Sequence, residues 1–449
     1  MNKLLRLAYY FLAALVALIV VYAILRFIQI AVSSQYQGER GPYLQMPAPD
    51  AMTIVWQTEA DIIGTLRYGK APDELDQFAD TGRLTDIHAI RLHGLEPDTR
   101  YYYALGAKGQ KEIGGKDFWF VTPPQETAPI RFWVLGDPGL PGPLQLEVRD
   151  AMLHWIKQHP RSGRPWLDLI LTTGDNAYTS GENKQYQTAF FEPFESVLRN
   201  IPVWPAYGNH DARRWAYFDL FMFPTRGESG GLESGTENYF SFDYGDVHFV
   251  MLDSESTSRR ADGAMHEWLR RDLAANRKKW LIAVFHHPPY TRGTHNSDDA
   301  GDSRGRMQDM RETFLPVLEQ AGVDLVFSGH SHMYERSYFI TCHYGRSTEL
   351  QAGHFRNKTL NGPYLKQKEK AGANEGTVYL VVGSSARIDQ GPLDHPVMAV
   401  AKRIAGSVLV DINGNKLITR FIDNKGQVVD EFSIEKGVTT APAGNVECR

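Results

Sequence analysis

The sequence predicts an N-terminal transmembrane helix, then a β-sandwich, and then an α/β domain with a buried sheet. An uncharged apolar run begins at Leu7, short strand-like segments separated by turn residues follow, and from Arg131 onward longer apolar runs alternate with helical patterns. The chain has 449 residues, of which 42% are hydrophobic and 22% charged, as is typical of a folded protein with more than one domain. We expect the three parts at residues 1–34, 41–125 and 126–449.

The first part has the features of a signal anchor. The run from Leu7 to Leu25 is close to the ~20 residues that span a bilayer, and it is longer than the apolar core of a cleavable signal peptide. Lys3 and Arg6 precede this run, so the positive-inside rule places the N-terminus in the cytoplasm. We therefore expect a single-pass protein of the cell membrane whose remaining chain is extracytoplasmic, either periplasmic or extracellular. The alternative is a secreted protein whose signal has been cleaved.

Charge and cysteine content argue against several classes of protein. The net charge is −5 and no long basic run occurs, so we expect no nucleic-acid binding. Cys342 and Cys448 are the two cysteines, too few for a zinc finger or a disulfide framework. In an oxidising compartment they either pair or stay free, and the sequence leaves both alternatives open. It also leaves the oligomeric state open.

Residues 41–125 are predicted to form the β-sandwich. Strand-like segments occur, for example, at 52–59 and 117–122. The Leu-x-Pro-x-Thr-x-Tyr spacing from Leu95 to Tyr101 is typical of the tyrosine corner of fibronectin-III-like sandwiches, in which the tyrosine hydroxyl bonds back to the preceding turn. No group of chemically active side chains lies in this part of the sequence, so we expect a structural or substrate-shaping role.

In the α/β domain, continuous apolar runs end abruptly at polar residues. Such runs are typical of strands buried on both faces, and ligands collect at the strand ends of these sheets. The polar ends should therefore converge on one site. They supply Asp137, Asp175, Tyr178, Asn209, His210, His286, His330 and His332. His248 is different: it lies inside an alternating strand, and we expect it to be a buried, hydrogen-bonded structural residue.

The residue types at these strand ends favour a metal centre. Oxygen and imidazole donors without a thiol suit iron, zinc or manganese, and seven candidate ligands exceed the four of a tetrahedral zinc site. With one bridging carboxylate they suit two metals roughly 3.5–4 Å apart, which clamp an in-line displacement at phosphorus. Either imidazole of His286-His287 could be a ligand, and the x-Pro pattern that follows favours His286.

The motifs occur in the order of a known family. They are Gly136-Asp137, Gly174-Asp175, Gly208-Asn209-His210, His286-x-Pro288 and Gly329-His330-x-His332, and they resemble the calcineurin-like metallophosphoesterases. The common first motif there is Asp-x-His, but Gly139 stands in place of that histidine. The chain instead has Gly-Asp-x-x-Tyr ending at Tyr178, as in the purple acid phosphatase branch. The resemblance extends over about 41–435.

This resemblance implies a fold of two packed mixed sheets flanked by helices and a centre of two metal ions. One ion would be Fe(III), and the other a divalent Zn, Mn or Fe ion. Their ligands would be Asp137, Asp175, Tyr178 and His332 for the first ion, and Asp175, Asn209, His286 and His330 for the second.

The same resemblance implies the chemistry. His210 and His295 would be catalytic and, with Asn209, would contact the substrate; we expect Asp211 to orient His210. The implied function is that of a membrane-anchored phosphatase that hydrolyses phosphate monoesters by attack of a metal-bound hydroxide. Alternatives are a phosphodiesterase acting on nucleotide, phospholipid or envelope phosphodiesters and, against the complete ligand set, a non-catalytic adhesion or binding protein.

Overall fold

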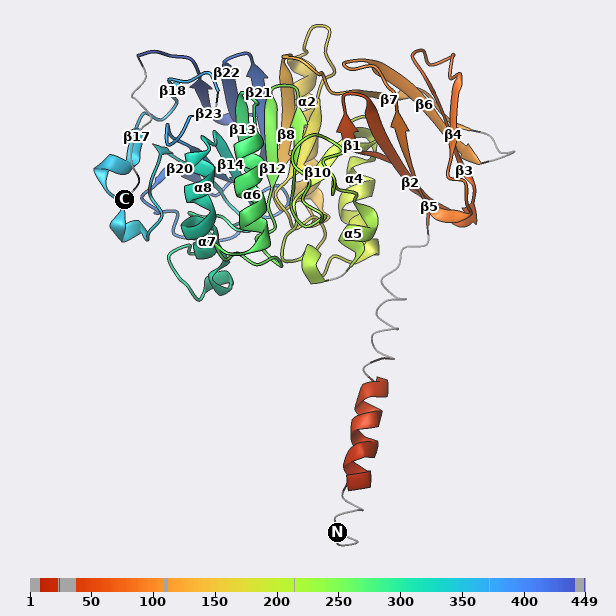
Figure 1. The fold of residues 1–449 in the computed structure, drawn as a ribbon, viewed down its shortest axis with the longest axis horizontal. Coiled ribbons are helices and arrows are strands. Elements are labelled where there is room, and N and C mark those ends of the chain that lie inside the picture. Colours follow the sequence, from red (N-terminus) through yellow and green to blue (C-terminus); the bar gives the residue numbers. More distant parts are fainter. Residues whose placement is uncertain are drawn as a thin grey trace.

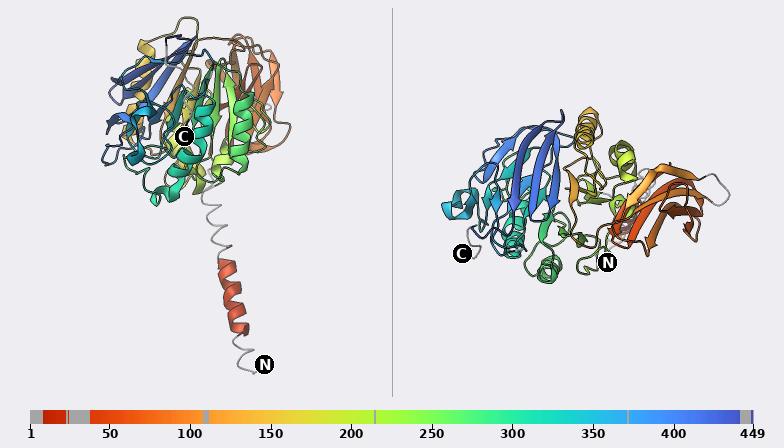
Figure 2. Two further views of the ribbon diagram at one scale, coloured as in Figure 1. Left: turned by 60° about the vertical axis from the view of Figure 1, so that its left-hand side comes forward. Right: turned by 90° about the horizontal axis from the view of Figure 1, so that it is seen from above.

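The structure is a computed structural model that describes residues 9–22, 24, 38–107, 112–213, 215–370, 372–440 and 448. It has a β-sandwich beside a larger domain built on two sheets (Figure 1; Figure 2). One sheet of the sandwich consists of β1 (Arg40–Ala48), β2 (Ala51–Ile62) and β5 (Thr85–His93). The other consists of β4 (Gln77–Asp80), β3 (Gly64–Gly69), β6 (Arg100–Ala107) and β7 (Ile113–Val121).

The sandwich contains the predicted tyrosine corner. The Tyr101 hydroxyl accepts a hydrogen bond of 2.9 Å from the Glu96 backbone N–H. The Tyr101 ring is buried and stacks on Phe120, with ring centroids 5.6 Å apart. The hydroxyl thereby fixes the turn that leads into β6, and this prediction is confirmed.

The larger domain contains two seven-stranded mixed sheets. The first has the order β10 (Val203–Pro205), β9 (Leu169–Thr172), β8 (Ile130–Leu135), β21 (Gly406–Asn413), β22 (Lys416–Asp423), β23 (Val428–Glu435) and β18 (Tyr364–Leu365). The second has the order β11 (Phe240–Tyr244), β12 (Val247–Met251), β13 (Trp280–Val284), β14 (Leu325–Ser328), β19 (Val378–Val381), β15 (Tyr334–Ser337) and β20 (Met398–Lys402). Strands β10, β9 and β8 are parallel, as are β12, β13, β14 and β19, so their carboxyl ends lie at one edge of each sheet.

The two sheets pack face to face, because alternate residues of their strands point toward each other. Phe132 on β8 meets Phe249 on β12 and Phe327 on β14, with ring centroids 5.4 and 6.4 Å apart. The next residue, Trp133, points the other way and packs on Phe194 of α4. Helices therefore cover the outer faces: α2 (Pro143–Gln158), α3 (Asn183–Tyr186), α4 (Glu192–Leu198), α5 (Ala216–Leu220), α6 (Ala264–Ala275), α7 (Arg306–Asp309) and α8 (Leu315–Gln320).

A short hairpin and a disulfide lie at the edge of the second sheet. The hairpin consists of β16 (Phe339–Ile340) and β17 (Phe355–Asn357). Just after β16, Cys342 is bonded to Cys448 across 106 residues of sequence. The structure thus decides between the two alternatives for the cysteines: they pair.

The predicted transmembrane helix is wrong. Within residues 1–34 the structure describes 9–22 and 24, which are helical; the remaining residues of that segment lie outside the described ranges. Among the described residues no helix combines the length and the apolar character that crossing a membrane requires. The predicted single-pass location in the cell membrane is therefore not supported either.

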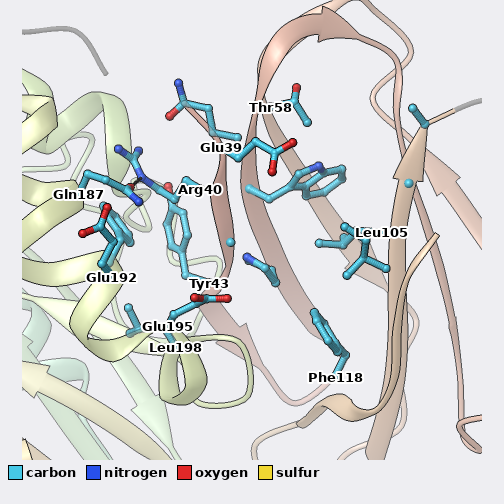
Figure 3. Close-up of a pocket in the computed structure, with 18 of the residues that line it drawn as sticks. Glu39, Arg40, Tyr43, Thr58, Leu105, Phe118, Gln187, Glu192, Glu195 and Leu198 are labelled. Carbon is cyan, nitrogen blue, oxygen red and sulfur yellow. Dashed lines mark hydrogen bonds between the residues drawn. The ribbon is translucent and has the colours of Figure 1, made fainter. Parts of the chain in front are cut away.

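The sandwich is attached to the larger domain by specific contacts. The Tyr43 hydroxyl of β1 donates to the Leu220 carbonyl over 2.7 Å, and the Tyr103 hydroxyl of β6 donates to the Arg199 carbonyl over 2.6 Å. Beside these contacts lies a cleft of about 500 Å³ (Figure 3). Figure 3 shows Glu192 and Glu195 of α4 on one wall and Phe118 on the other. The residues that line this cleft include none of the predicted metal ligands.

His248 on β12 is held between two carboxylates, and we call Asp243, His248 and Asp272 the His248 cluster. Its Nδ1 lies 2.7 Å from Asp243 and its Nε2 lies 2.8 Å from Asp272. Asp272 also accepts hydrogen bonds from the Ser241 hydroxyl and the Leu232 backbone N–H. Burial would lower the pKa of His248, but the two carboxylates raise it to about 9. The expectation of a structural role is therefore confirmed.

Candidate metal centre

Polar residues follow directly on the carboxyl ends of five strands from both sheets. They are Asp137 after β8, Asp175 and Tyr178 after β9, Asn209 and His210 after β10, His286 after β13, and His330 and His332 after β14. Because the two sheets pack face to face and these ends lie on the same side, the side chains meet at one place. The structure thus brings together the seven predicted metal ligands.

Tyr178 lies at the centre of the first group of donors. Its hydroxyl is 2.9 Å from Asp175 Oδ2, 3.5 Å from Asp137 Oδ2 and 3.1 Å from His332 Nε2. Its side chain is buried together with both carboxylates. We call Asp137, Asp175, Tyr178 and His332 the first half-site.

Gly139, at the position that is histidine in an Asp-x-His motif, allows Tyr178 to reach this position. The Gly139 backbone N–H donates to the Asp175 carbonyl, and the Tyr178 N–H donates to the Gly139 carbonyl, over 3.0 and 2.9 Å. A Cβ at position 139 would lie 2.3 Å from the backbone N of Ala177. Only glycine permits this approach, since real Cβ contacts are not that short.

His286 lies at the centre of the second group of donors. Its Nε2 is 3.0 Å from Asn209 Oδ1 and 3.5 Å from Asp175 Oδ1, while its Nδ1 is 2.9 Å from the Thr173 carbonyl. The His330 ring lies 5.0 Å from the His286 ring. We call Asp175, Asn209, His286 and His330 the second half-site; Asp175 belongs to both.

The neighbouring imidazole, His287, has other partners. Its Nδ1 is 2.9 Å from the Ser254 hydroxyl, and its Nε2 is 3.6 Å from Glu255. Its ring nevertheless lies 4.5 Å from that of His330, and one nitrogen from each of His286, His287 and His330 falls within 4.8 Å of the others. The contacts of His286 with Asn209 and Asp175 make it the better-placed ligand.

The donors fit a pair of metal ions. Asp137, Asp175 and His286 each offer a ligand atom, and these atoms lie within 4.8 Å of one another. Burial, and then the imidazolium charges that His286 and His287 would carry, lower the pKa of His330 well below 6.5, so its ring is neutral and has a lone pair to donate. Burial and the carboxylates of Asp175 and Asp137 raise the pKa of Tyr178 well above 10. A cation among these groups would relieve the repulsion between the carboxylates and stabilise a phenolate.

His210 and His295 lie on two sides of this centre. His210 Nδ1 is 2.7 Å from the Thr179 carbonyl, and its Nε2 is 4.0 Å from Asp175 Oδ2. The His295 ring stacks on the His330 ring at 3.9 Å, and its Nδ1 is 2.9 Å from Asp302 Oδ1. Both imidazoles are partly exposed and therefore accessible to a substrate.

The expectation that Asp211 orients His210 is wrong. Asp211 is buried and accepts hydrogen bonds from the backbone N–H groups of Asn176 and Gly208 and from the Tyr186 hydroxyl. Burial, and then the charge of Asp175, raise the pKa of Asp211 to about 7. Asp211 thus joins the loops that carry the two half-sites. The Thr179 carbonyl, and not Asp211, orients His210.

The sequence did not predict three side chains that lie within hydrogen-bond distance of site histidines and are not part of either half-site. They are Asp389 beside His332, Asp302 beside His295, and Ser303, whose hydroxyl is 2.7 Å from His330 Nε2. None follows a strand of the predicted series, and none has a spacing that signals its role. Only the tertiary approach of their loops reveals them.

Comparison with known proteins agrees with the family that the motifs resemble. The calcineurin-like phosphoesterase family matches residues 130–334, and the purple acid phosphatase N-terminal domain family matches residues 40–122. Purple acid phosphatase 22 of Arabidopsis thaliana is 30% identical over 66% of this chain and 66% of its own length. Purple acid phosphatase 15 of the same plant is 31% identical over 56% of this chain and 49% of its own length. The matches thus span less than two thirds of the length of these curated relatives.

Solved structures agree on the fold. The purple acid phosphatase PPD1 from yellow lupin (Lupinus luteus) seeds superimposes with a TM-score of 0.68 and 18% identity, over 88% of this chain and 74% of that one. The order of the two matched families, the N-terminal domain before the phosphoesterase domain, agrees with the sandwich that precedes the larger domain in the structure. The chain belongs to the purple acid phosphatase branch of the calcineurin-like metallophosphoesterases, a class of metal-dependent phosphoric ester hydrolases.

Proposed function

We propose that this protein is a phosphatase that hydrolyses phosphate monoesters at a dinuclear metal centre. The observation that carries the proposal is the first half-site, where the Tyr178 hydroxyl lies within 3.5 Å of Asp137, Asp175 and His332. A tyrosine that served packing alone would not need two buried carboxylates and an imidazole nitrogen around its hydroxyl. This arrangement instead suits a cation bound by a phenolate.

We assign one ion to each half-site, with Asp175 as the bridge. The first half-site gathers anionic oxygen ligands, which favour Fe(III); the second offers one shared carboxylate, an amide and two imidazoles, which suit a divalent Zn, Mn or Fe ion. When bound, the two ions polarise the phosphoryl group and lower the pKa of a water nucleophile. The substrate is accordingly a dianionic phosphate group on an alcohol or phenol.

The chain's own residues bind and orient this substrate. The Thr179 carbonyl fixes His210 at Nδ1, so that its Nε2 is directed toward the Asp175 side of the centre. Asp302 fixes His295 at Nδ1 in the same way, beside the second half-site. The two imidazoles would thus contact the phosphate group from the side of each half-site, and the Asn209 amide, held at 3.0 Å from His286 Nε2, would contact it as well.

The test is an assay of the purified protein reconstituted with iron and zinc. Metal content and the visible spectrum are measured beside the hydrolysis of 4-nitrophenyl phosphate and bis(4-nitrophenyl) phosphate. We expect two metals per chain, a visible charge-transfer band and faster hydrolysis of the monoester. Faster hydrolysis of the diester would replace this assignment with a phosphodiesterase, and metal binding without hydrolysis of either ester would contradict both.

A matched pair of tyrosine variants tests the ligand assignment. Tyr178→Phe should abolish the visible band, because the phenolate oxygen is lost. Tyr244→Phe is the control, since Tyr244 is also buried but its hydroxyl has no hydrogen-bond partner among the described residues. An unchanged band in Tyr178→Phe would remove Tyr178 from the ligand set.

A further inference from the structure

Asp389 lies behind His332, on the side that faces away from the candidate metal centre. Its Oδ2 is 2.7 Å from His332 Nδ1, and its backbone N–H donates to the His332 carbonyl over 3.4 Å. In the neutral imidazole, a hydrogen bond donated from Nδ1 to Asp389 leaves the lone pair of His332 on Nε2. That nitrogen is 3.1 Å from the Tyr178 hydroxyl and 3.5 Å from Asp137 Oδ2. Asp389 therefore decides which nitrogen of His332 faces the first half-site.

The imidazoles of the second half-site are held differently. His286 has the neutral backbone carbonyl of Thr173 at its Nδ1, at 2.9 Å. A carboxylate behind an imidazole makes the imidazole a stronger electron donor than a carbonyl does, because the negative charge supports the polarised N–H bond. His332 is thus the more strongly donating of the two ligands.

The two half-sites also differ in charge: the first half-site, which has the more strongly donating histidine, also has more negative charge. Besides the shared Asp175, the first half-site has the carboxylate of Asp137 and the ionisable phenol of Tyr178, and Asp389 adds a charge from behind. The second half-site adds the amide of Asn209 and the imidazoles of His286 and His330, none of which contributes a negative charge. An ion of higher charge is therefore favoured at the first half-site.

Arg387 weakens the effect of the Asp389 carboxylate on His332. Its Nε lies 2.8 Å from Asp389 Oδ2, the same oxygen that His332 Nδ1 contacts. The guanidinium and the imidazole therefore compete for one oxygen. Arg387 is about half exposed, so it can be replaced without disturbing buried packing.

We propose that Asp389 is a positioning residue that, opposed by Arg387, strengthens His332 as a ligand and makes the first half-site selective for the more highly charged ion. This inference rests on the proposed dinuclear centre. Asp389 does not touch the substrate; it acts through His332. Its role is therefore measured best on the metal and not on the turnover.

The experiment measures the half-time of iron loss to a chelator, together with the position of the visible band, in the iron- and zinc-reconstituted protein. We expect Asp389→Asn to lose iron about 10–100-fold faster than the wild type, as for other outer partners of metal-bound histidines. The band should shift at the same time, because His332 donates less. Arg387→Gln should hold iron as long as the wild type or longer, since it frees the Asp389 oxygen for His332.

The opposite sign of the two variants separates tuning from structural damage. Asp394→Asn serves as the control, because this aspartate lies on the same segment, is largely exposed and pairs with Arg292 at 3.4 Å. Equal rates of iron loss in Asp389→Asn and the wild type, or equally accelerated loss in Asp389→Asn and Arg387→Gln, would overturn the inference. A wild-type protein that binds no iron would instead remove the proposed function on which it rests.

Discussion

The candidate metal centre and the His248 cluster are built from the same residue types, and both are buried next to the second sheet. In the His248 cluster each imidazole nitrogen has its own carboxylate, and the inner carboxylate, Asp272, has two further donors. In the metal centre the groups instead face one another: Asp137 and Asp175 flank a single hydroxyl, and neighbouring imidazole rings are 5.0 Å apart.

This difference distinguishes a structural cluster, the His248 cluster, from a ligand-binding site, the candidate metal centre. A cluster whose polar groups are all paired lowers the free energy of the fold and has no capacity left for a ligand. A cluster in which like groups converge costs stability until a cation binds. Substitutions in the two clusters should therefore have opposite consequences for stability and for activity.

The largest effect is expected at the bridge of the metal centre. Asp175→Asn keeps the shape of the side chain but removes the charge that both half-sites share. We expect kcat/KM for 4-nitrophenyl phosphate to fall by about 10³-fold or more, since the ions supply several kcal/mol of transition-state stabilisation. The metal-free variant should unfold at the same urea concentration as the metal-free wild type, or a higher one. A clear loss of stability would mean that Asp175 belongs to the scaffold.

Replacement of the central imidazole of the His248 cluster should give the reverse result. His248→Asn leaves the buried Asp272 carboxylate without its charged partner, which should cost about 3 kcal/mol of unfolding free energy. The kcat of the molecules that remain folded should match that of the wild type. Urea unfolding and a kinetic assay on the same preparation measure both; a large fall in kcat at unchanged stability would contradict the comparison.

The His248 cluster also predicts a pH dependence of stability. The pKa of His248 is raised to about 9 in the folded chain, from about 6.5 in an unfolded one. Its stabilisation is therefore fully present below pH 6.5 and is lost as the pH rises through 9. The difference in unfolding free energy between wild type and His248→Asn should shrink by roughly 3 kcal/mol between pH 6 and pH 9.5. A difference that stays constant across this range would show that His248 does not titrate as the geometry indicates.

A smaller effect is expected at the edge of the metal centre. Asp302 holds His295 at Nδ1 and also accepts the Asn296 backbone N–H over 2.8 Å. Asp302→Asn should lower kcat about tenfold with KM nearly unchanged, because His295 loses the carboxylate that orients it toward the substrate. Asp299→Asn, on the exposed part of the same loop, is the control. A change confined to KM would place Asp302 in substrate binding instead.

The centre could be predicted because strand ends are readable in a sequence. An apolar run that stops at Gly-Asp or Gly-Asn-His marks both a buried strand and the polar group at its end, as for Asp175 and Asn209. The order of these ends resembles that of the family, and this resemblance supplied the expected ligands. The groups that orient them, such as Asp389 and the Thr173 carbonyl, lie in loops whose approach depends on the whole fold.

Parts of the fold were not predicted for similar reasons. Strand β1 contains Pro42 and Pro47, which weaken a strand pattern, yet it pairs with β2 and carries Tyr43 to the larger domain. Strands β21, β22 and β23 complete the first sheet from the C-terminal part of the chain, and polar residues interrupt their apolar runs. The transmembrane prediction took apolar composition as sufficient, but among the described residues no helix is both long and apolar enough to cross a membrane.

The backbone hydrogen bonds of Gly139 make the choice of ligand in the first half-site exclusive. Restoring a histidine at position 139 would require the Asp175–Tyr178 loop to withdraw, and the tyrosine would leave with it. The chain can therefore hold one ligand or the other, never both. A designer who wants a histidine ligand at position 139 must therefore rebuild the loop as a unit rather than exchange a single residue.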